Sequence, residues 1–465
     1  MSDRPSLEPS IIVIFGVTGD LSKRYLLPAL YHLFKDNLLN EHTTIIGLTR
    51  QSMTTDELFG QVELCINEVD NICDPAGLKK MRENTELHQF DPADPVGYPK
   101  LLEYLNQLEE KQGMCLNRLY YLSIPPQLFT DVVHNIGAGG LNGSCQHGTA
   151  KTRLLVEKPF GYDLSSAEAL IAETSKVFKE EQVFRIDHYL AKETVQNILT
   201  FRQHNPVFAG IWDDAHIKTI EVVAREKIGI AGRKNFYEGV GALRDFIQSH
   251  LLQLAAITTM ELPADSSSQS IHESRQALLE SITPADPALA VRAQYDSYKD
   301  EVGNPDSTTE TFASIKLFIG GERWQGTPLT ITTGKSLAEK RTEVTVTFTN
   351  PHIDSEVTNT LTFRLQPNEG IHLELRIKKP GFDNELEDAA MDFSYQHTFG
   401  ESSPHPDAYE RVLVDAVRGD RTLFATSAEV LASWRITEPI IQAWRDNADG
   451  MTTYASGSTG PDIAP

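Results

Sequence analysis

The stretch Ile11-Ile12-Val13-Ile14-Phe15-Gly16-Val17-Thr18-Gly19-Asp20-Leu21-Ser22 decides the fold of the first part of the chain. Its apolar half predicts a strand that is buried on both faces, as in the centre of a parallel sheet. The two glycines predict a turn, and a helical pattern follows from Lys23 to Leu39. This order of elements can bind a dinucleotide, because the helix N-terminus holds the pyrophosphate. Ser22 stands where a third glycine is common, so a turn without a ligand is the alternative.

The next strand indicates which dinucleotide would bind. Residues Thr44 to Thr49 predict a strand, and Arg50 follows it directly. In a dinucleotide-binding fold, an acidic residue at this place favours NAD, whereas an arginine can pair with the 2′-phosphate of NADP. Arg50 therefore indicates NADP, with an ordinary surface arginine as the alternative.

The composition limits the kinds of partner. The 465 residues suit two domains, and the formal net charge of -23 disfavours non-specific binding to nucleic acid or to an anionic membrane. The four cysteines, at positions 65, 73, 115 and 145, show no metal-ligand spacing and are expected to be free thiols in a reducing compartment. The first residues contain no signal-peptide core. We therefore expect a cytoplasmic protein.

Strands and helices alternate as far as Ile186, which is typical of a parallel sheet. The predicted strand Thr152 to Val156 leads into Glu157-Lys158-Pro159. A lysine at the carboxyl end of such a strand is a candidate for the cleft between cofactor and substrate, because α/β sheets bind ligands at that edge. A solvent-exposed lysine at a strand end is an equally good reading of Lys158.

The densest group of polar residues is the nonapeptide Arg185-Ile186-Asp187-His188-Tyr189-Leu190-Ala191-Lys192-Glu193. It ends one strand and begins a helix, so it also lies at a strand end. A carboxylate, an imidazole, a phenol and an ammonium within six residues suit an anionic ligand better than a solvated turn.

A helix predicted from Gly241 to Ile257 carries His250 on its apolar face. The commoner reading is a core histidine, and the functional reading is a general base that a carboxylate orients. Asp245 precedes His250 by five residues, about 140° around an α-helix, so the two cannot pair along it. Asp187 is then the candidate partner.

The last part of the chain is rich in strands. Alternating patterns from Thr311 onwards predict a mostly antiparallel sheet with helices on one face. Between two of these strands, Lys335 and Lys340 form a cationic stretch that is either a binding loop or a basic hairpin tip.

Four motifs together resemble the glucose-6-phosphate dehydrogenase family. They stand in family order over nearly the whole chain and are Gly16-Val-Thr-Gly-Asp-Leu-Ser-Lys-Arg, Glu157-Lys-Pro-Phe-Gly, the nonapeptide, and Leu243-Arg-Asp-Phe-Ile-Gln-Ser-His-Leu-Leu-Gln. The resemblance implies oxidation of glucose 6-phosphate to 6-phosphogluconolactone with NADP, the first step of the oxidative pentose phosphate pathway. NAD is a weaker alternative, and no metal is implied.

The resemblance also implies an architecture. A Rossmann-like NADP-binding domain is expected over residues 1–186, and an α+β domain for substrate binding and dimerisation over residues 187–454. A flexible tail is expected over residues 455–465, and the protein would be a homodimer or homotetramer. The chain departs from the family at Ala191, where glycine is frequent, and by ending early, so no second NADP site is expected.

The roles that the resemblance implies fall on named residues. His250 would be the general base and Asp187 its partner. The substrate would be bound by Lys158, His188, Tyr189, Lys192, Glu226, Asp245, Lys335 and Lys340, whose cations would supply positive potential. NADP would be bound by Gly16, Thr18, Gly19, Asp20, Leu21, Ser22, Arg50, Tyr121 and Lys158.

Two other functions remain open at this point. A relative of glucose–fructose oxidoreductase would share the Glu-Lys-Pro motif but would not explain the phosphate-binding group in the nonapeptide. A non-catalytic NADP sensor on the same fold is disfavoured, because both Asp187 and His250 are present.

Overall fold

The computed structural model describes residues 7–70, 73–143, 145, 150–230, 232–350, 358–400, 406–447 and 450–461. The chain divides into two compact units. The first consists of Met1–Gly161, Ser165–Ala191 and Pro406–Ser427, and the second of Tyr162–Leu164, Lys192–His405 and Ala428–Pro465. The predicted division at residues 186 and 187 therefore differs in two ways. The boundary lies five residues later, and a late segment returns to the first unit.

The first unit is built on a seven-stranded sheet with the order β15-β6-β5-β4-β1-β2-β3. Its strands are β1 (Ser10–Phe15), β2 (Thr44–Thr49), β3 (Thr85–Gln89), β4 (Asn117–Leu122), β5 (Thr152–Val156), β6 (Val183–Ile186) and β15 (Phe424–Ala425). All pairs are parallel except β15 with β6. The central, fully buried position predicted for the first strand is confirmed, because β1 lies between β4 and β2.

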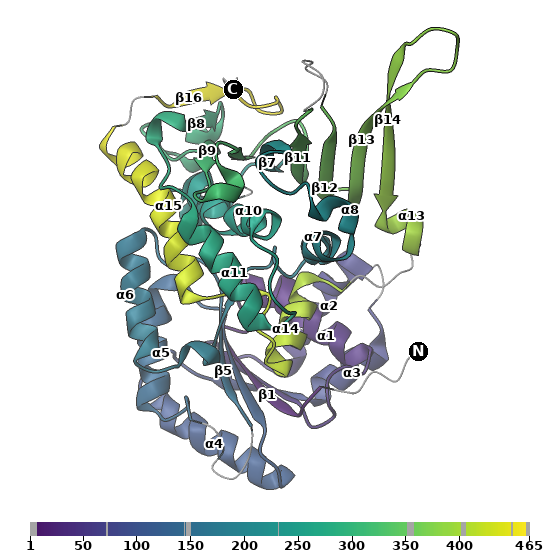
Figure 1. Ribbon diagram of the computed structural model, residues 1–465. Coiled ribbons are helices and arrows are strands. Elements are labelled where there is room, and N and C mark those ends of the chain that lie inside the picture. The colour runs from purple at the N-terminus through teal and green to yellow at the C-terminus, as the bar shows by residue number, and fades with distance from the viewer. Residues whose placement is uncertain are drawn as a thin grey trace. The chain divides into compact units, whose positions relative to one another are not determined.

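Helices cover both faces of this sheet (Figure 1). A π-helical segment, Ser22–Leu26, leads into α1 (Leu27–Lys35). The others are α2 (Thr55–Asp70), α3 (Pro75–Glu83), α4 (Gly97–Gln112), α5 (Phe129–Ala138), α6 (Leu164–Ser175) and α14 (Ala408–Arg418). Phe15, at the end of β1, packs against Phe90 and Tyr98 in the hydrophobic core. Burial of such aromatic side chains supplies much of the stabilisation of a sheet of this kind.

Two cysteines of the first unit correct a prediction. Cys115 and Cys145 form a disulfide with their Cα atoms 5.8 Å apart, so the expectation of four free thiols is wrong for this pair. Cys65 and Cys73 keep their thiols. The two bonded cysteines precede β4 and β5, which are neighbours in the sheet. Strand pairing brings them together across a separation of 30 residues, which their spacing in the sequence cannot reveal.

The second unit is built on a nine-stranded sheet with the order β14-β13-β12-β11-β7-β10-β9-β8-β16. The strands are β7 (Ile217–Arg225), β8 (Ala290–Tyr295), β9 (Phe312–Phe318), β10 (Pro328–Gly334), β11 (Arg341–Phe348), β12 (Thr360–Gln366), β13 (Gly370–Lys378), β14 (Leu386–Ser394) and β16 (Thr452–Tyr454). Only the pairs β7–β10 and β8–β16 are parallel among the described strands of this sheet. The predicted, mostly antiparallel sheet is confirmed.

The helices of the second unit are α7 (Glu193–His204), α8 (Pro206–Ala209), α9 (Lys234–Tyr237), α10 (Leu252–Thr259), α11 (Ser268–Ser281), α12 (Tyr298–Val302), α13 (Tyr395–Phe399) and α15 (Ser427–Asp446), with a π-helix at Leu243–Leu251. Among them, α7, α10 and the π-helix pack against the middle strands of this sheet, and α13 lies at its edge strand β14. The long hairpin β13–β14 extends from one edge of the sheet (Figure 1). Within the described residues, no helix has the length and apolar character needed to cross a membrane.

The C-terminal tail corrects another prediction. Residues 455–461 continue from β16 into defined contacts: Gly457 N–H donates to the carbonyl of Ser336, and Ala338 N–H to that of Ser458. The expected flexible tail is therefore wrong over these residues, while 462–465 lie outside the described part. The composition Ser-Gly-Ser-Thr-Gly-Pro is typical of disorder, but backbone hydrogen bonds to a distant loop hold this segment.

Candidate active site

The glycine turn after β1 has the geometry that the sequence predicts. Gly16 has φ +82°, and a Cβ added there would lie 2.2 Å from the carbonyl oxygen of Ser123, so only glycine fits. The hydroxyl of Ser22 donates to the carbonyl of Gly16 at 3.1 Å and lies 2.9 Å from the Ser123 hydroxyl, within hydrogen-bond distance. The Ser22 side chain thus links the two ends of the turn. Thr18, Gly19, Asp20 and Leu21 lie between these two residues, and the Asp20 carboxylate pairs with Arg24 at 2.8 Å.

Arg50 lies where the sequence places it, directly after β2 and beside the end of β1. Its side chain is exposed, and among the described residues no carboxylate pairs with it. A guanidinium in this position can accept a phosphate of a dinucleotide.

The ends of β4 and β5 hold a buried tyrosine and a carboxyl group. Tyr121 is fully buried, and its hydroxyl donates to Glu157 Oε1. Burial raises the pKa of Glu157 to about 7; the Tyr121 hydrogen bond and Lys158 lower it, and Asp187 raises it further. These effects place Tyr121, Glu157, Lys158 and Asp187 near one another at one edge of the sheet.

Asp187 organises the turn after β6. Its carboxylate is 3 % exposed and accepts a hydrogen bond from the Tyr189 N–H at 3.0 Å. Its carbonyl accepts a second one from the Leu190 N–H. Tyr189, Leu190 and Ala191 are buried, so alanine is accommodated where the family often has glycine. The nonapeptide therefore forms a compact turn rather than a solvated loop.

His188 meets a residue that the sequence analysis missed. Its ring stacks on Tyr409 with centroids 6.5 Å apart, and Tyr409 in turn stacks on Tyr25 at 5.4 Å. Tyr409 lies on α14, which joins the first unit from residues 406–427. No local pattern marks this residue, because it reaches the turn only through the return of the chain to the first unit.

Lys192 begins α7 in the second unit, and its ammonium donates to Gln366 Oε1 at 3.1 Å. The amide of Gln366 also donates to the Thr342 hydroxyl at 3.0 Å. Gln366 ends β12 and was not predicted as a site residue. Its side-chain amide is neutral and contacts the lysine through its oxygen.

Lys335 is the centre of a buried polar cluster in the second unit. Its side chain is 2 % exposed and pairs with Glu226, and Asp245 Oδ2 lies 3.5 Å from its ammonium. The rings of Tyr237 and Phe246 flank the same ammonium, with centroids at 5.2 and 5.4 Å. Two carboxylates and one ammonium give acceptors and a donor that suit sugar hydroxyls. The contribution of Lys335 to positive potential stays a prediction.

The helix that carries His250 is a π-helix over Leu243–Leu251. In that geometry the backbone bonds run from i to i+5, so residues five apart lie one turn apart on the same side. The predicted angle of about 140° between Asp245 and His250 is therefore wrong, because it holds only for an α-helix. His250 is 2 % exposed, and its ring meets the edge of Phe246 at 5.8 Å.

A buried glutamate fixes the start of this π-helix. Glu310 Oε1 accepts the Leu243 N–H at 2.9 Å, where an anion is favoured by the helix dipole. Gly241 makes room for it, since an added Cβ would lie 2.3 Å from that same oxygen. Lys340, by contrast, is exposed just before β11. The structure thus gathers Glu226, Asp245, His250 and Lys335 around one helix and one loop.

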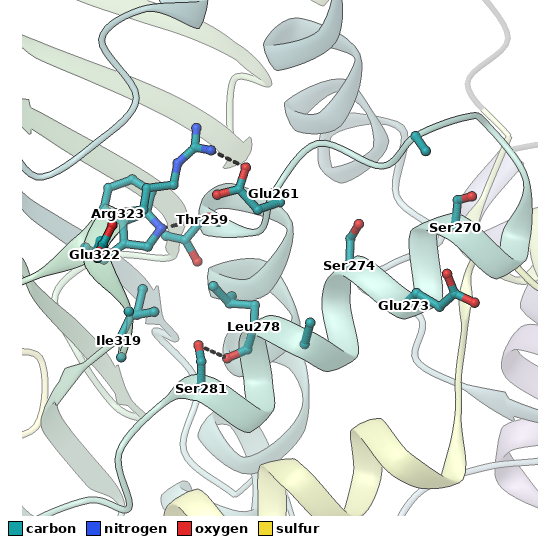
Figure 2. A pocket seen from close by; sticks show the side chains of 15 residues that line it. Thr259, Glu261, Ser270, Glu273, Ser274, Leu278, Ser281, Ile319, Glu322 and Arg323 are labelled. Carbon is teal, nitrogen blue, oxygen red and sulfur yellow. Dashed lines mark hydrogen bonds and ion pairs between the residues drawn. The ribbon is translucent and has the colours of Figure 1, made fainter.

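A separate cavity of about 680 Å³ lies in the second unit beside α11 (Figure 2). Its lining includes Glu261, Glu273 and Glu322, and its Arg323 already pairs with Glu261. It contains none of the predicted site residues. The excess of carboxylates would repel a sugar phosphate, so this cavity is not the candidate active site.

Comparison with known proteins gives matches along the whole chain. The family description "Glucose-6-phosphate dehydrogenase, NAD binding domain" matches residues 13–197, and "Glucose-6-phosphate dehydrogenase, C-terminal domain" matches residues 199–465. A glucose-6-phosphate 1-dehydrogenase of Chlamydia muridarum is 36% identical, covering 98% of this chain and 94% of its own. Glucose-6-phosphate 1-dehydrogenase 2 of Mycobacterium tuberculosis H37Rv is 37% identical over 98% of this chain and 92% of its own.

Solved structures agree. A glucose-6-phosphate dehydrogenase in complex with glucose 6-phosphate has a TM-score of 0.90 at 31% identity, covering 99% of this chain and 97% of its own. A 3-ketoreductase from Actinomadura kijaniata, at 14% identity and a TM-score of 0.52, shares the fold alone.

Proposed function

The chain belongs to the glucose-6-phosphate dehydrogenase family, and we infer that it oxidises glucose 6-phosphate to 6-phosphogluconolactone, with a nicotinamide dinucleotide as hydride acceptor. In the family this is the first step of the oxidative pentose phosphate pathway. One observation carries the proposal beyond family membership. In the second unit, the ring of Phe246 lies against both the ring of His250 and the ammonium of Lys335, which pairs with Glu226 and lies 3.5 Å from Asp245.

The substrate would be held at two kinds of site. His188, Tyr189 and Lys192 would bind the phosphate, as the family resemblance implies, and the Lys192 ammonium donates to Gln366 Oε1. Glu226 and Asp245 would accept hydrogen bonds from sugar hydroxyls, and Lys335 would donate one while balancing these carboxylates. Lys340 would contribute from the loop end. Binding energy from the phosphate then orients the distant anomeric carbon.

His250 would be the general base that takes the proton of the anomeric hydroxyl. Asp187 would pair with it and stabilise the imidazolium, as in other histidine–carboxylate pairs. This pairing stays a prediction. Lys158, at the end of β5, would lie between the substrate and the cofactor.

The residues of the first unit fit a nicotinamide dinucleotide. Gly16 lets the Ser123 backbone approach the turn closely, and a helical segment starts at Ser22, where N–H groups can bind phosphate. Thr18, Gly19, Asp20, Leu21 and Ser22 would contribute from the turn, with Tyr121 at the end of β4. Bound there, the dinucleotide would accept the hydride from the anomeric carbon.

We propose NADP as the preferred dinucleotide and NAD as the weaker one. The support is Arg50, whose exposed guanidinium follows β2 where a 2′-phosphate would lie. Initial rates with both cofactors, and with glucose 6-phosphate against glucose, test the proposal by absorbance of the reduced nicotinamide. Equal rates with glucose would favour a glucose–fructose oxidoreductase type of reaction, and no reduction at all would favour a sensor.

We also propose that copies of the chain associate through the hairpin β13–β14. Ile377 is 46% exposed and Met391 64%, and Leu373 pairs with Met391 on the same face of the hairpin. An apolar sheet face of this kind is typical of a surface covered by a partner. Light scattering after gel filtration should give a dimer or tetramer, and the variant Ile377→Glu/Met391→Glu should give a smaller species.

A further inference from the structure

We propose that the C-terminal segment 452–460 is a brace that positions Lys335, and that Tyr454 is its main positioning residue. The role of Lys335 in binding the sugar rests on the proposed function. The brace itself acts on the backbone of the loop 334–338 at the end of β10 and does not depend on that role.

The loop that carries Lys335 has an unfavourable backbone. Ser336 has φ +53°, in the left-handed region that residues other than glycine, asparagine and aspartate seldom adopt. Such conformations persist only where the surrounding contacts impose them. Some of these contacts come from residues next to β9 and after β7. Lys335 N–H donates to the carbonyl of Thr311 at 2.9 Å, Ser336 N–H to that of Ile228 at 3.0 Å, and Leu337 N–H to that of Glu226 at 2.9 Å.

The C-terminal segment supplies the remaining ones. The Tyr454 hydroxyl donates to the carbonyl of Lys335 at 2.6 Å. Gly457 N–H donates to the carbonyl of Ser336 at 2.7 Å, and Ala338 N–H donates to the carbonyl of Ser458 at 2.8 Å. The segment thus binds the loop at both sides of the strained residue.

Tyr454 is itself held independently of the loop. Its side chain is 5 % exposed, and its hydroxyl lies 2.9 Å from the Thr311 hydroxyl. Its ring packs against Phe312 and Tyr295, and β16 pairs with β8 at the same level. A fixed anchor of this kind can hold a strained loop, whereas a mobile one would move with it.

The consequence concerns the ammonium of Lys335. That ammonium lies between two carboxylates and two aromatic rings. Its position depends on the backbone conformation at Lys335, because the backbone sets the direction of the side chain. Loosening the backbone at Lys335 and Ser336 would misplace the ammonium without changing its chemistry. The effect should therefore fall on substrate binding more than on the chemical step.

Tyr454→Phe tests the brace, because it removes the hydroxyl and keeps the ring. The matched control is Tyr295→Phe, which removes a buried hydroxyl from the same ring cluster but one that bonds to Glu301. We expect Tyr454→Phe to raise KM for glucose 6-phosphate roughly five- to tenfold, with kcat and KM for NADP within twofold. Tyr295→Phe should leave all three within twofold.

Amide hydrogen exchange gives a readout that needs no activity. In Tyr454→Phe, the amides of Ser336, Leu337 and Ala338 should exchange about tenfold faster, and in Tyr295→Phe they should not. Equal exchange and equal KM in the two variants would overturn the brace. A different outcome is that the amides exchange faster in Tyr454→Phe while Lys335→Met leaves KM for glucose 6-phosphate unchanged. That outcome would reject the proposed role of Lys335 and keep the brace.

Discussion

The first unit places its candidate residues at the carboxyl ends of neighbouring strands, whereas the second encloses its own around a π-helix and a loop. Arg50 in the first unit is exposed, and the turn after β6 is held by hydrogen bonds from the N–H groups of Tyr189 and Leu190 to Asp187. Lys335 in the second unit is 2 % exposed and balanced by two carboxylates. A substitution at the exposed Arg50 of the first unit should therefore change binding alone. In the second unit, one should change binding and stability together, because it leaves a buried charge without its partner.

The largest effect is expected at the enclosed base. His250→Asn should lower kcat by roughly 10³-fold or more, because no group would then accept the anomeric proton, while KM for glucose 6-phosphate stays within a few-fold. Steady-state rates measure both. His272→Asn, which changes another buried histidine of the same unit, is the control and should keep most of the turnover. Turnover near that of the unchanged protein in His250→Asn would reject this residue as the base.

The second effect tests the coupling of binding and stability. Lys335→Met would leave Glu226 and Asp245 facing each other in a buried place, at a cost of about 3–5 kcal/mol. We expect both a lower Tm and a KM for glucose 6-phosphate raised by roughly 10- to 100-fold. Calorimetry and kinetics on one preparation measure the pair. Lys299→Met, on the exposed side of α12, should change neither. A raised KM with an unchanged Tm would break the comparison.

The third effect depends on pH and lies in the first unit. Burial raises the pKa of Glu157 from 4.5 to about 7, so the folded protein keeps a proton that the unfolded chain releases. The contribution of this group to stability is fully present below the unfolded pKa and is lost as pH rises through the folded pKa. The free energy of unfolding of the protein, relative to that of Glu157→Gln, should therefore fall by about 3 kcal/mol between about pH 4.5 and pH 7 and then level off. An identical pH profile for the two proteins would contradict the raised pKa, and the exposed Glu41→Gln should show no such trend.

The smallest effect is expected at the exposed arginine. Arg50→Ala should raise KM for NADP about tenfold and leave KM for NAD within twofold, because only NADP carries the 2′-phosphate. Its Tm should stay unchanged, which is the opposite of Lys335→Met. Arg82→Ala, at a surface ion pair with Asp56, serves as the control. A drop in Tm at Arg50 would show that the first unit also couples binding to stability.

The sequence predicts the first unit's candidate site well for a physical reason. Buried strands, glycine turns and strand ends all have local patterns, and the edge of a parallel sheet brings strand ends together. Gly16, Arg50, Lys158 and Asp187 therefore lie at strand ends or in strand-end turns, as predicted. Tyr409 and the disulfide partner Cys145 do not follow from any local pattern, because they meet their neighbours through topology.

The second unit was less predictable. Its antiparallel strands follow from alternation, but the π-helix has no pattern distinct from an α-helix, and this reversed the geometry inferred for Asp245 and His250. The contribution of Lys335 to positive potential stays a prediction, because two carboxylates lie beside its ammonium. The ordered tail was missed as well, since its hydrogen bonds go to a loop more than a hundred residues earlier.

The return of residues 406–427 to the first unit has a consequence for synthesis. Strand β15 completes the edge of the first sheet by pairing with β6, and Ser427 joins Arg185 and Glu180 in one hydrogen-bonded group. The ribosome makes these residues only near the end of the chain. During translation, the outer edge of β6 therefore stays unpaired until β15 is made, although N-terminal domains usually fold first. A fragment that stops at Ala191 would keep that edge permanently, and exposed edges of this kind favour aggregation.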